Sequence, residues 1–340
     1  MKVMPVNRRI VLACRPDGEP RLTDFRLESV DMPQAPDGSL LLKTKFLSLD
    51  PYMRWRMNDA PSYAPPVALG APMVGSTVSE IVVSRHPDFK EGELVLGQSG
   101  WQEFAISDGA GLRRLDEAHA PVSTALGILG SPGLTAYTGL LNIGQPKAGE
   151  TLVVAAATGP VGSLVGQIGK LKGCRTVAIA GGDEKCRYAR DVLGFDVAID
   201  HRSMDLRAQL EAACPAGIDI YFENVGGKVW ESVHPLLNPF ARIPVCGLVS
   251  QYNDADEETN KSSSSEFMRS ILVKRLTIRG FIVTDFTAQM PDFLRDVGEW
   301  LSAGKLAHRE HIVDGLASAP EAFIGMLKGR NFGKLIVRVG

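Results

Sequence analysis

The sequence predicts an α/β protein in which a strand-rich first part is followed by a doubly wound parallel sheet. The main observation is the segment 151–162, TLVVAAATGPVG, where an apolar run leads into a turn of small residues and then a helix. A continuous apolar run without polar alternation is typical of a strand buried on both faces. Two further observations are the alternation of strands and helices after this segment and the short strands, broken by Pro and Gly, before it.

The turn after the apolar run has the spacing of a G-x-G-x-x-G motif, with Ala157 in place of the first glycine. Gly159 would let the backbone approach a pyrophosphate, and Gly162 would let the next helix, predicted over 161–172, pack closely on the strand. The glycine pattern alone is equally compatible with a plain turn. A second apolar run at 176–180 completes a βαβ unit and favours a dinucleotide site. The turn residues predicted to bind the dinucleotide are Ala157, Thr158, Gly159, Pro160, Val161 and Gly162.

The residues after the second strand favour NADP over NAD. An NAD-binding unit usually ends this strand with Asp or Glu, which bonds the ribose 2′-hydroxyl. Here the strand runs into Gly181, and Lys185 and Arg187 follow closely, which suits a 2′-phosphate. The alternative is that both cations are solvated residues on the first turn of a helix predicted over 184–193. Asp183 could support NAD, but its position favours the N-cap of that helix.

Composition and charge exclude several classes of protein. The chain has 340 residues, enough for two domains, and its 44% apolar and 22% charged residues are typical of a soluble globular protein. The net charge of −2 provides no basic field for nucleic acid or an anionic membrane. Five widely spaced cysteines, none in a C-x-x-C pair, argue against a disulfide framework and fit a reducing cytoplasm. The apolar run at 10–13 is too short for a signal peptide, and no segment approaches membrane-spanning length, so a cytosolic protein is expected.

The part before residue 125 is expected to form a compact, barrel-like β domain. Its strands are predicted at 25–30, 39–49, 75–83, 94–97 and 101–105. The segment 124–130 and a helix over 134–141 would join this domain to the βαβ unit. The last strand of the chain, predicted at 334–339, is expected to return to the β domain.

The part after the βαβ unit continues the alternation that predicts a parallel sheet with right-handed crossovers. Ligands of such a sheet lie beyond the carboxyl ends of its strands. The Ser-rich segment 253–266 is a candidate for a mobile loop or lid, with plain surface disorder as an equal alternative. Further strands are predicted at 197–199, 217–223, 241–248 and 272–281, and helices at 204–213, 228–237 and 292–301.

Seven motifs occur in a characteristic order: LSLDPYMRWRM, LGSPGLTAYTGLL, KAGETLVVAAATGPVGSLVGQIGKLKGC, IDIYFENVGG, ARIPVCGLVSQYN, ILVKRLTIRGFIV and GMLKGRNFGKLIV. Over nearly its full length the chain resembles the zinc-independent leukotriene/prostaglandin reductase branch of the medium-chain dehydrogenase/reductase superfamily, which includes plant alkenal double-bond reductases and bacterial curcumin reductases. The resemblance implies a GroES-like β-barrel domain, 1–125 completed by 305–340, and a Rossmann domain, 126–304, with the active site between them. It also implies NADPH-dependent reduction of carbon–carbon double bonds conjugated to a ketone or aldehyde, by a protein that is commonly a homodimer.

The pattern of possible metal ligands argues against zinc. Zinc-dependent relatives need a Cys and a His at matched positions and a four-cysteine lobe in the first half of the chain. This half has only Cys14, with His86 and His119. His308 and His311, three residues apart on a possible helix, form the only other metal-like pair and are expected to be surface residues.

Conjugate reduction requires the protein to position two reactants and to supply a hydrogen bond to the carbonyl oxygen as negative charge develops there. Tyr252 is the best candidate donor, because Ser-Gln-Tyr-Asn follows the fifth strand of the sheet and the family has a functional tyrosine in this motif. The alternatives are that Tyr252 lines the pocket or anchors the loop, and that a ribose hydroxyl of the cofactor polarises the carbonyl. Tyr52, the counterpart from the β domain, is expected to shape the substrate pocket, and no chemistry is assigned to Arg54 or Arg56.

The resemblance implies further cofactor contacts and shows two departures from the family. Where the family often has a tyrosine in an Asn-Tyr-Lys turn after the third strand, this chain has Asp200, His201 and Arg202. His201 could stack or hydrogen-bond near the adenosine phosphate, and a simple turn histidine is an equal alternative. Trp55 stands where the family often has glycine and could alter the substrate entrance. The implied contacts are Asn224, Val225, Cys246, Gly247 and Asn331.

Two other functions remain compatible with the sequence. One is an NADPH:quinone oxidoreductase on the same fold, which activity on a non-quinone enone would separate. The other is a non-catalytic NADPH-binding sensor, which cofactor binding without turnover would indicate.

Overall fold

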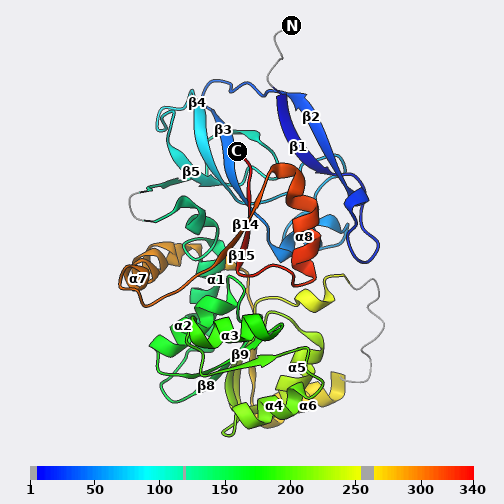
Figure 1. Ribbon diagram of the computed structural model, residues 1–340, viewed down its shortest axis with the longest axis vertical. Coiled ribbons are helices and arrows are strands. Elements are labelled where there is room, and N and C mark those ends of the chain that lie inside the picture. Colours follow the sequence, from blue (N-terminus) through cyan, green and yellow to red (C-terminus); the bar gives the residue numbers. More distant parts are fainter. Residues whose placement is uncertain (1–5, 118–119, 254–263) are drawn as a thin grey trace. The chain divides into compact units, whose positions relative to one another are not determined.

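The computed structural model describes residues 6–117, 120–253 and 264–340 (Figure 1). The chain divides into two compact units. One contains residues 1–127 and 310–340, and the other contains residues 128–309. We call them the β unit and the nucleotide-fold unit and describe each by itself.

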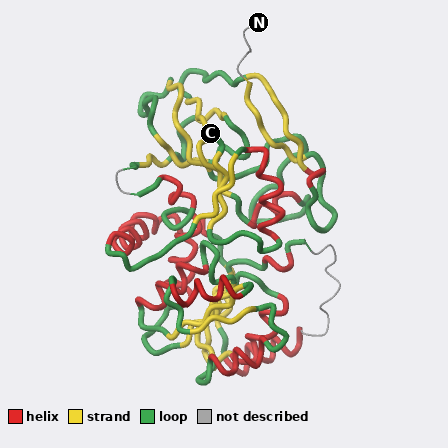
Figure 2. The backbone as a smooth tube through the Cα atoms, viewed as in Figure 1, coloured by secondary structure: helices red, strands yellow, loops and turns green. Residues whose placement is uncertain are grey.

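The nucleotide-fold unit is built on a six-stranded parallel sheet with the strand order β10-β9-β8-β11-β12-β13. This order confirms the predicted doubly wound sheet, because the chain starts at the central strand β8, moves outward to one edge and then to the other. Figure 2 shows these strands gathered between helices. The strands are β8 (Thr151–Ala155), β9 (Arg175–Ala180), β10 (Val197–Asp200), β11 (Ile218–Phe222), β12 (Leu237–Val245) and β13 (Thr277–Gly280). The helices are α1 (Ser131–Thr138), α2 (Gly162–Leu171), α3 (Asp183–Asp191), α4 (Leu206–Ala213), α5 (Gly227–Val233), α6 (Ser264–Lys274) and α7 (Met290–Ser302).

Strand β8 is buried on both faces, as its apolar run predicts. Leu152 and Val154 point into a core formed with α1, α2 and α7, whereas Val153 and Ala155 point into a second core formed with α4 and α5. Alternate side chains of a strand face opposite sides of the sheet, so one apolar strand serves two cores. Each fully buried valine or leucine stabilises the fold by about 1.5–3 kcal/mol. The carboxyl end of β8 is thereby held in the middle of the sheet.

The segment before β13 differs from the prediction. Residues 264–274 form helix α6, and the strand expected at 272–281 is confined to Thr277–Gly280. The apolar run before the strand is short and fits a helix as well as a strand. In the structure Ile271 packs on the sheet, whereas Leu272 is exposed. Most of the predicted mobile loop 253–266 lies outside the described residues. Its last residues, 264–266, belong to α6.

The β unit contains a seven-stranded sheet and a two-stranded ribbon. The sheet runs β14-β15-β3-β4-β5-β7, and β6 pairs with β3, so β3 has three partners. The predicted return of the last strand is confirmed, because β15 pairs antiparallel with β3 and parallel with β14. The strands are β1 (Val6–Leu12), β2 (Phe25–Asp31), β3 (Leu40–Ser48), β4 (Thr77–Ser84), β5 (Leu94–Gly97), β6 (Phe104–Ser107), β7 (Arg113–Leu115), β14 (Glu310–Asp314) and β15 (Lys334–Arg338); helix α8 (Ala319–Leu327) packs on them. Sequence reasoning missed β1, β7, β14 and α8.

The core of the β unit fixes the 3₁₀ helix η2 (Pro51–Met57), which carries Tyr52. Met53 and Met57 are fully buried in a cluster that includes Trp101. The Trp101 ring stacks on Phe25 at 5.6 Å between centroids and meets Phe323 of α8 edge-on at 5.7 Å. The two methionines therefore anchor η2 in an aromatic core.

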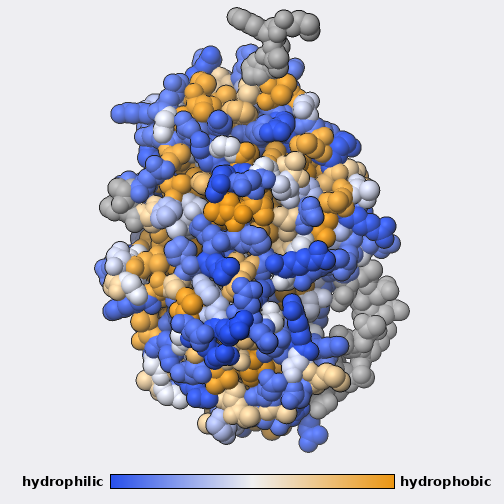
Figure 3. Space-filling model, viewed as in Figure 1, coloured by the Kyte–Doolittle hydropathy of each residue, from blue (hydrophilic) through white to orange (hydrophobic). Residues whose placement is uncertain are grey.

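The surface is that of a polar, water-exposed protein on the face shown in Figure 3, where apolar side chains are scattered in small groups. Among the described residues, no helix combines the length and apolar character needed to cross a bilayer.

Candidate functional site

The turn after β8 begins with a strained residue. Ala156 has φ +50°, in the left-handed region that non-glycine residues rarely adopt. The left-handed residue of the turn is therefore Ala156 and not Ala157, which the motif places at the first glycine. Ala157 donates its N–H to the Ile179 carbonyl at 3.0 Å, and Gly159 donates to the Ala156 carbonyl at 2.9 Å. These bonds fold the chain back from β8 toward α2.

Gly162 makes this tight entry into α2 possible. A Cβ at this position would lie 2.5 Å from the Ala156 carbonyl oxygen and 2.9 Å from the Ala157 Cα, both of which are backbone atoms. At Gly159 the same construction gives 3.3 Å to the Ala156 oxygen, which is tight but less severe. The predicted close packing of helix on strand thus depends on Gly162. Of the other turn residues, Thr158 is buried and Pro160 and Val161 are half-buried.

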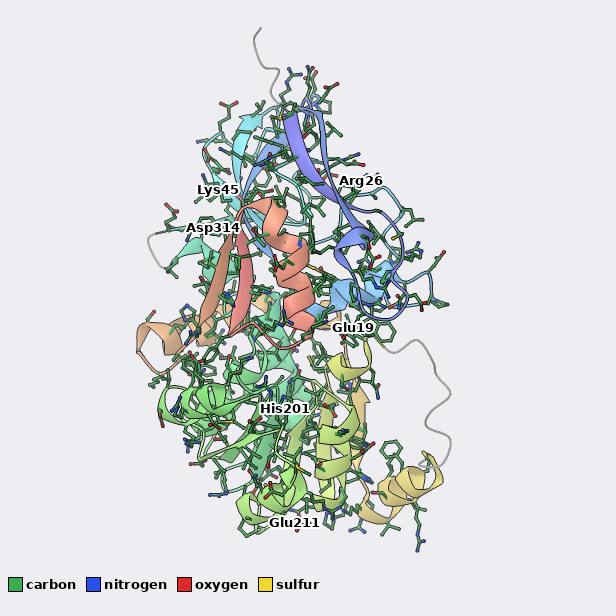
Figure 4. All side chains as sticks on the ribbon, turned by 45° about the vertical axis from the view of Figure 1, so that its right-hand side comes forward. Glu19, Arg26, Lys45, His201, Glu211 and Asp314 are labelled. Carbon is green, nitrogen blue, oxygen red and sulfur yellow. The ribbon has the colours of Figure 1, made fainter. Side chains whose placement is uncertain are left out.

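A cluster of nitrogen-bearing side chains lies at the carboxyl ends of β9 and β10. A Cβ on Gly181 would meet the His201 Nε2 at 2.8 Å, and one on Gly182 would meet the Arg202 Nη1 at 3.1 Å. His201, labelled in Figure 4, is held by its own N–H, which donates to the Ala180 carbonyl at 2.9 Å. The side chains of the turn after β10 therefore fill the space that the two glycines leave open.

The electrostatics of this cluster favour an anion. Burial lowers the pKa of Lys185, and the nearby Arg202 lowers it further. Burial also lowers the pKa of His201; Asp200 opposes this shift, while Arg202 and Lys185 add to it. Positive groups that disfavour one another's charge gain when an anion is placed among them. We call Lys185, Arg202 and His201 the cation cluster, although His201, with its lowered pKa, is mainly neutral at pH 7.

Two neighbours of the cation cluster differ from the prediction. The N-cap of α3 is Gly182, with φ +90°, and Asp183 is the first helical residue and makes no capping bond. Glycine takes the cap because the backbone there adopts a positive φ. Arg187 is exposed, whereas Lys185 is half-buried.

The carboxyl ends of β11 and β12 are joined by hydrogen bonds. The N–H groups of Cys246 and Gly247 both donate to the Glu223 carbonyl, at 2.9 and 3.2 Å. Asn224 donates its side-chain amide to the Ala155 carbonyl at 2.8 Å and so links this edge to the turn after β8. Burial, together with Glu223, raises the pKa of the Cys246 thiol to about 12, so the thiol stays protonated at neutral pH.

Tyr252 lies over this edge of the sheet. Its hydroxyl oxygen accepts the Leu248 N–H at 3.4 Å, and a Cβ on Gly247 would be only 2.9 Å from that oxygen. The loop is fixed by Ser250, which donates both its hydroxyl and its N–H to the Val225 carbonyl, at 2.6 and 3.0 Å. A tyrosine hydroxyl can accept one hydrogen bond and donate another. The geometry therefore suits a hydrogen-bond donor at the carboxyl end of β12.

Sequence reasoning missed Glu223, which shapes the turn carrying Asn224. Its side chain is buried, and its Oε1 accepts the N–H groups of Val225 and Gly226 at 2.7 and 2.9 Å and the hydroxyl of Tyr221 at 3.0 Å. Within the described part of the chain, its Oε2 has no hydrogen-bond partner. Burial raises the pKa of Glu223 even though the hydrogen bonds oppose the shift. The only available signal was an acidic residue directly after a buried strand, which a solvated strand end explains as well.

We expect Glu223→Gln to show a stability difference that depends on pH. A raised carboxyl pKa stabilises the folded state fully below the unfolded pKa, about 4.3, and this contribution is lost as pH rises through the folded pKa. Glutamine keeps an oxygen that can accept the backbone N–H groups but cannot ionise. The Tm of the variant minus that of wild type should therefore increase by a few degrees as pH rises from about 4 to neutral, since 1 kcal/mol corresponds to about 2–4 °C. Thermal unfolding followed by circular dichroism measures this, and a constant difference across that range would contradict the assignment.

The sequence-predicted residues of the β unit lie at two turns. Tyr52 is half-buried at the start of η2, and burial together with Asp50 raises the pKa of its hydroxyl. Asn331 is half-buried before β15 and donates its side-chain amide to the Gly333 carbonyl at 2.9 Å. Arg54 is buried and donates to the Gly18 carbonyl at 2.8 Å, which is a structural role. Trp55 is 39% exposed.

The predicted histidine pair does not lie on a helix. His311 belongs to strand β14, and His308 precedes it. A strand forms because 310–314 pairs with β15 residue by residue. Among the described residues, no group of three or more His, Cys, Asp and Glu side chains is arranged to hold a metal ion.

The groups of the nucleotide-fold unit follow one another along one edge of the sheet. In the order of the strands, the cation cluster lies at β10 and β9, the glycine turn at β8, Asn224 at β11, and Cys246 and Tyr252 beyond β12. Four strand spacings of about 4.8 Å place the two ends of this series roughly 19 Å apart. Such a series matches an extended ligand with an anionic end, a central phosphate pair and a flat, weakly polar end. Together with the doubly wound sheet it defines a nucleotide-dependent oxidoreductase fold with an added β unit.

Comparisons with known proteins agree with this class. The model of a family described as the N-terminal domain of oxidoreductase matches residues 8–115, and that of a family described as zinc-binding dehydrogenase matches residues 160–299. The chain is 57% identical to the NADPH-dependent curcumin reductase of Escherichia coli over 98% of this chain and 97% of that protein. It is 39% identical to the NADP(+)-dependent 2-alkenal reductase of Nicotiana tabacum, with coverage of 98% and 97%. The crystal structure of CurA from Vibrio vulnificus in complex with NADPH superposes with a TM-score of 0.95 at 53% identity, covering 98% of this chain and 99% of that one.

The chain belongs to the zinc-independent reductase branch of the medium-chain dehydrogenase/reductase superfamily.

Proposed function

We propose that this protein is an NADPH-dependent reductase of carbon–carbon double bonds conjugated to a ketone or aldehyde. The observation that carries the proposal is the Tyr252 hydroxyl, which lies over Gly247 at the carboxyl end of β12 and accepts the Leu248 N–H. A hydroxyl so placed can donate to a carbonyl oxygen at the reactive end of a bound dinucleotide. The relatives described above, a curcumin reductase and an alkenal reductase, act on this kind of double bond by their names.

The residues present fit NADPH. The turn 157–162 would hold the diphosphate, because Gly162 brings the N-terminus of α2 against the strand end. The cation cluster would hold the 2′-phosphate, with Gly181 giving it room. Asn224, Cys246 and Gly247 would line the nicotinamide end, and Asn331 is a further cofactor contact that the family resemblance implies.

When bound, NADPH would supply a hydride for the β-carbon of the substrate. As the hydride arrives, negative charge develops on the substrate's carbonyl oxygen. The Tyr252 hydroxyl donates a hydrogen bond to that oxygen, and the Leu248 N–H fixes the direction of the donation. Tyr52 keeps its proton at neutral pH, since the pKa of its hydroxyl is raised. Its role is to shape the pocket wall. The enolate of the substrate would then take a proton from solvent water at the α-carbon.

The proposal is tested by measuring the oxidation of NADPH and of NADH in parallel. The acceptors are a medium-length alkenal, benzalacetone, curcumin and a simple quinone. We expect NADPH-selective turnover of the enones, with the saturated ketone or aldehyde as product. Turnover of the quinone alone would indicate a quinone oxidoreductase. NADPH binding without turnover of any acceptor would indicate a sensor.

Gly162→Ala is expected to weaken NADPH binding about tenfold or more, because its Cβ would displace the backbone of Ala156 and Ala157 at the diphosphate turn. Gly159→Ala is the matched control on the same turn and should have a smaller effect, since its nearest contact is 3.3 Å. Calorimetric titration with NADPH measures both affinities. Equal losses in the two variants would show that the close contact at Gly162 does not control the site.

We also propose that the protein is a homodimer in the cytoplasm. All five cysteines are free thiols, which suits a reducing compartment. Among the described strands, β13 pairs only with β12, and its residues are largely exposed. An exposed edge strand can pair with a second copy of itself. Light scattering after gel filtration should give twice the chain mass of 36.7 kDa, and cell fractionation tests the compartment.

A further inference from the structure

The β unit contains a buried ion pair that joins two turns far apart in the sequence. Lys334 is only 3% exposed, and its ammonium group donates to the Asp50 carboxylate and, at 2.9 Å, to the Leu49 carbonyl. The other carboxylate oxygen of Asp50 accepts the Ser48 hydroxyl. The ammonium group thus makes two hydrogen bonds, and each carboxylate oxygen of Asp50 accepts one.

Stability alone is a poor reason for this pair. Removing two charges from water costs several kcal/mol per ion, and well-packed apolar residues often stabilise a fold as well as a buried ion pair does. The neighbouring pair Lys45–Glu80 shows the ordinary alternative: it is 3.6 Å long, and its side chains are 35% and 37% exposed. The same sheet can hold ion pairs at its surface, as Lys45–Glu80 shows. The burial of the Lys334–Asp50 pair therefore suggests that the pair fixes a particular geometry.

The pair is placed where two functional turns meet. Asp50 is the N-cap residue of η2, directly before Pro51 and Tyr52. Lys334 is the first residue of β15, three positions after Asn331, and its neighbour Leu335 accepts the Leu49 N–H at 3.2 Å. The turn that carries the pocket tyrosine and the turn that carries the cofactor asparagine are thus tied by one ion pair and one backbone bond.

The surroundings hold Lys334 in place, and its partner Asp50 acts electrostatically on Tyr52. A Cβ on Gly127 would lie 3.4 Å from the Lys334 Cγ, so the stem of the lysine packs against a residue that has no side chain. Asp50 is also one of the groups that act electrostatically on the Tyr52 hydroxyl. Without the Lys334 ammonium, the half-buried Asp50 carboxylate would lie close to Tyr52 without its cation.

We propose that the Lys334–Asp50 ion pair is a positioning device that sets the Asn331 turn and the Tyr52 turn relative to each other, so that one contact controls both cofactor affinity and the shape of the substrate pocket. This rests on the proposed function, which assigns Asn331 to the cofactor and Tyr52 to the pocket. Displacing reacting groups by about 1 Å can cost roughly a hundredfold in rate. Loss of the pair should therefore be visible in binding constants of the folded enzyme.

The test compares Lys334→Met, Asp50→Asn, the double variant and Lys334→Arg with the control Lys45→Met, which removes the same charge from the exposed pair of the neighbouring strand (Figure 4). The readouts are the Kd for NADPH by calorimetry without substrate, and kcat and KM for an enone, at temperatures well below each Tm. We expect Lys334→Met to raise both the Kd and the KM about tenfold. Lys334→Arg should recover part of the loss, and the double variant should be less impaired than the two single effects combined.

A purely structural role would lower Tm and the fraction of active enzyme but leave the Kd and KM of the folded protein unchanged. Values for Lys334→Met and Asp50→Asn equal to those of Lys45→Met would overturn the proposal. If Lys334→Met did not fold, Asp50→Asn would decide, because Lys334 keeps its bond to the Leu49 carbonyl there. If wild type bound NADPH but reduced no enone, the proposed function would fall and the NADPH Kd alone would decide on the ion pair. If wild type bound no NADPH, both would fall.

Discussion

Replacing Tyr252 with phenylalanine is expected to lower kcat for enone reduction by roughly ten- to a thousandfold while changing the affinity for NADPH much less. The ring remains, so the loop that Ser250 holds to the Val225 carbonyl should keep its shape. What is lost is the hydroxyl over Gly247, whose donation is needed only when charge develops on the carbonyl oxygen. An interaction made mainly in the transition state appears in kcat.

Single-turnover mixing of the NADPH-loaded enzyme with benzalacetone measures the chemical step directly. Tyr188→Phe is the matched control, because it removes a hydroxyl from α3 of the same unit, where the Tyr188 ring packs against Arg309. The control should keep near-wild-type kcat. An unchanged rate for Tyr252→Phe would assign polarisation of the carbonyl to the cofactor's ribose hydroxyl and leave Tyr252 as a pocket or loop residue.

The sequence predicted those strands and helices whose conformation is determined by their own residues and immediate neighbours. The run 151–155 is apolar on both faces and is bounded by turn residues, which favours a central strand, and Gly162 follows at the distance at which a helix must pack on it. The strand predicted at 272–281 was wrong in its first half, because a short apolar run fits a helix and a strand equally well. Which side chains of such a run are buried depends on the elements that cover it. Periodicity alone does not contain that information.

Site residues were predictable where a motif marks them and were missed where a distant partner defines them. Lys185 follows a strand end in the expected place, and His201 and Arg202, which the sequence already marked as candidates, lie beside it from the turn after β10. Glu223 differs, since its role depends on backbone N–H groups that only the folded turn presents. Lys334 is 284 residues from Asp50, and no pattern of spacing connects them.

Neutralising the cation cluster is expected to change cofactor selectivity. Lys185→Ala combined with Arg202→Ala should weaken NADPH binding by roughly ten- to a hundredfold, because a hydrogen bond to a charged group contributes about 1.5–3 kcal/mol. NADH has a 2′-hydroxyl in place of the phosphate, so its affinity should change little. The selectivity for NADPH would then fall by about the same factor as the NADPH affinity.

Arg187→Ala decides whether the effect belongs to the cluster or to any cation near the strand end. Arg187 lies on the same helix as Lys185 and is exposed, whereas Lys185 is half-buried beside Arg202. Raising the salt concentration screens exposed charges more than buried ones, so the Arg187 contribution should vanish near 0.5 M salt while that of Lys185 persists. Calorimetric Kd values for NADPH and NADH at two salt concentrations measure both effects. If Arg187→Ala matched the double variant, or if NADH affinity fell as far as NADPH affinity, the 2′-phosphate would have to be recognised elsewhere, and the crowding of Lys185, His201 and Arg202 would be a feature of the turn alone.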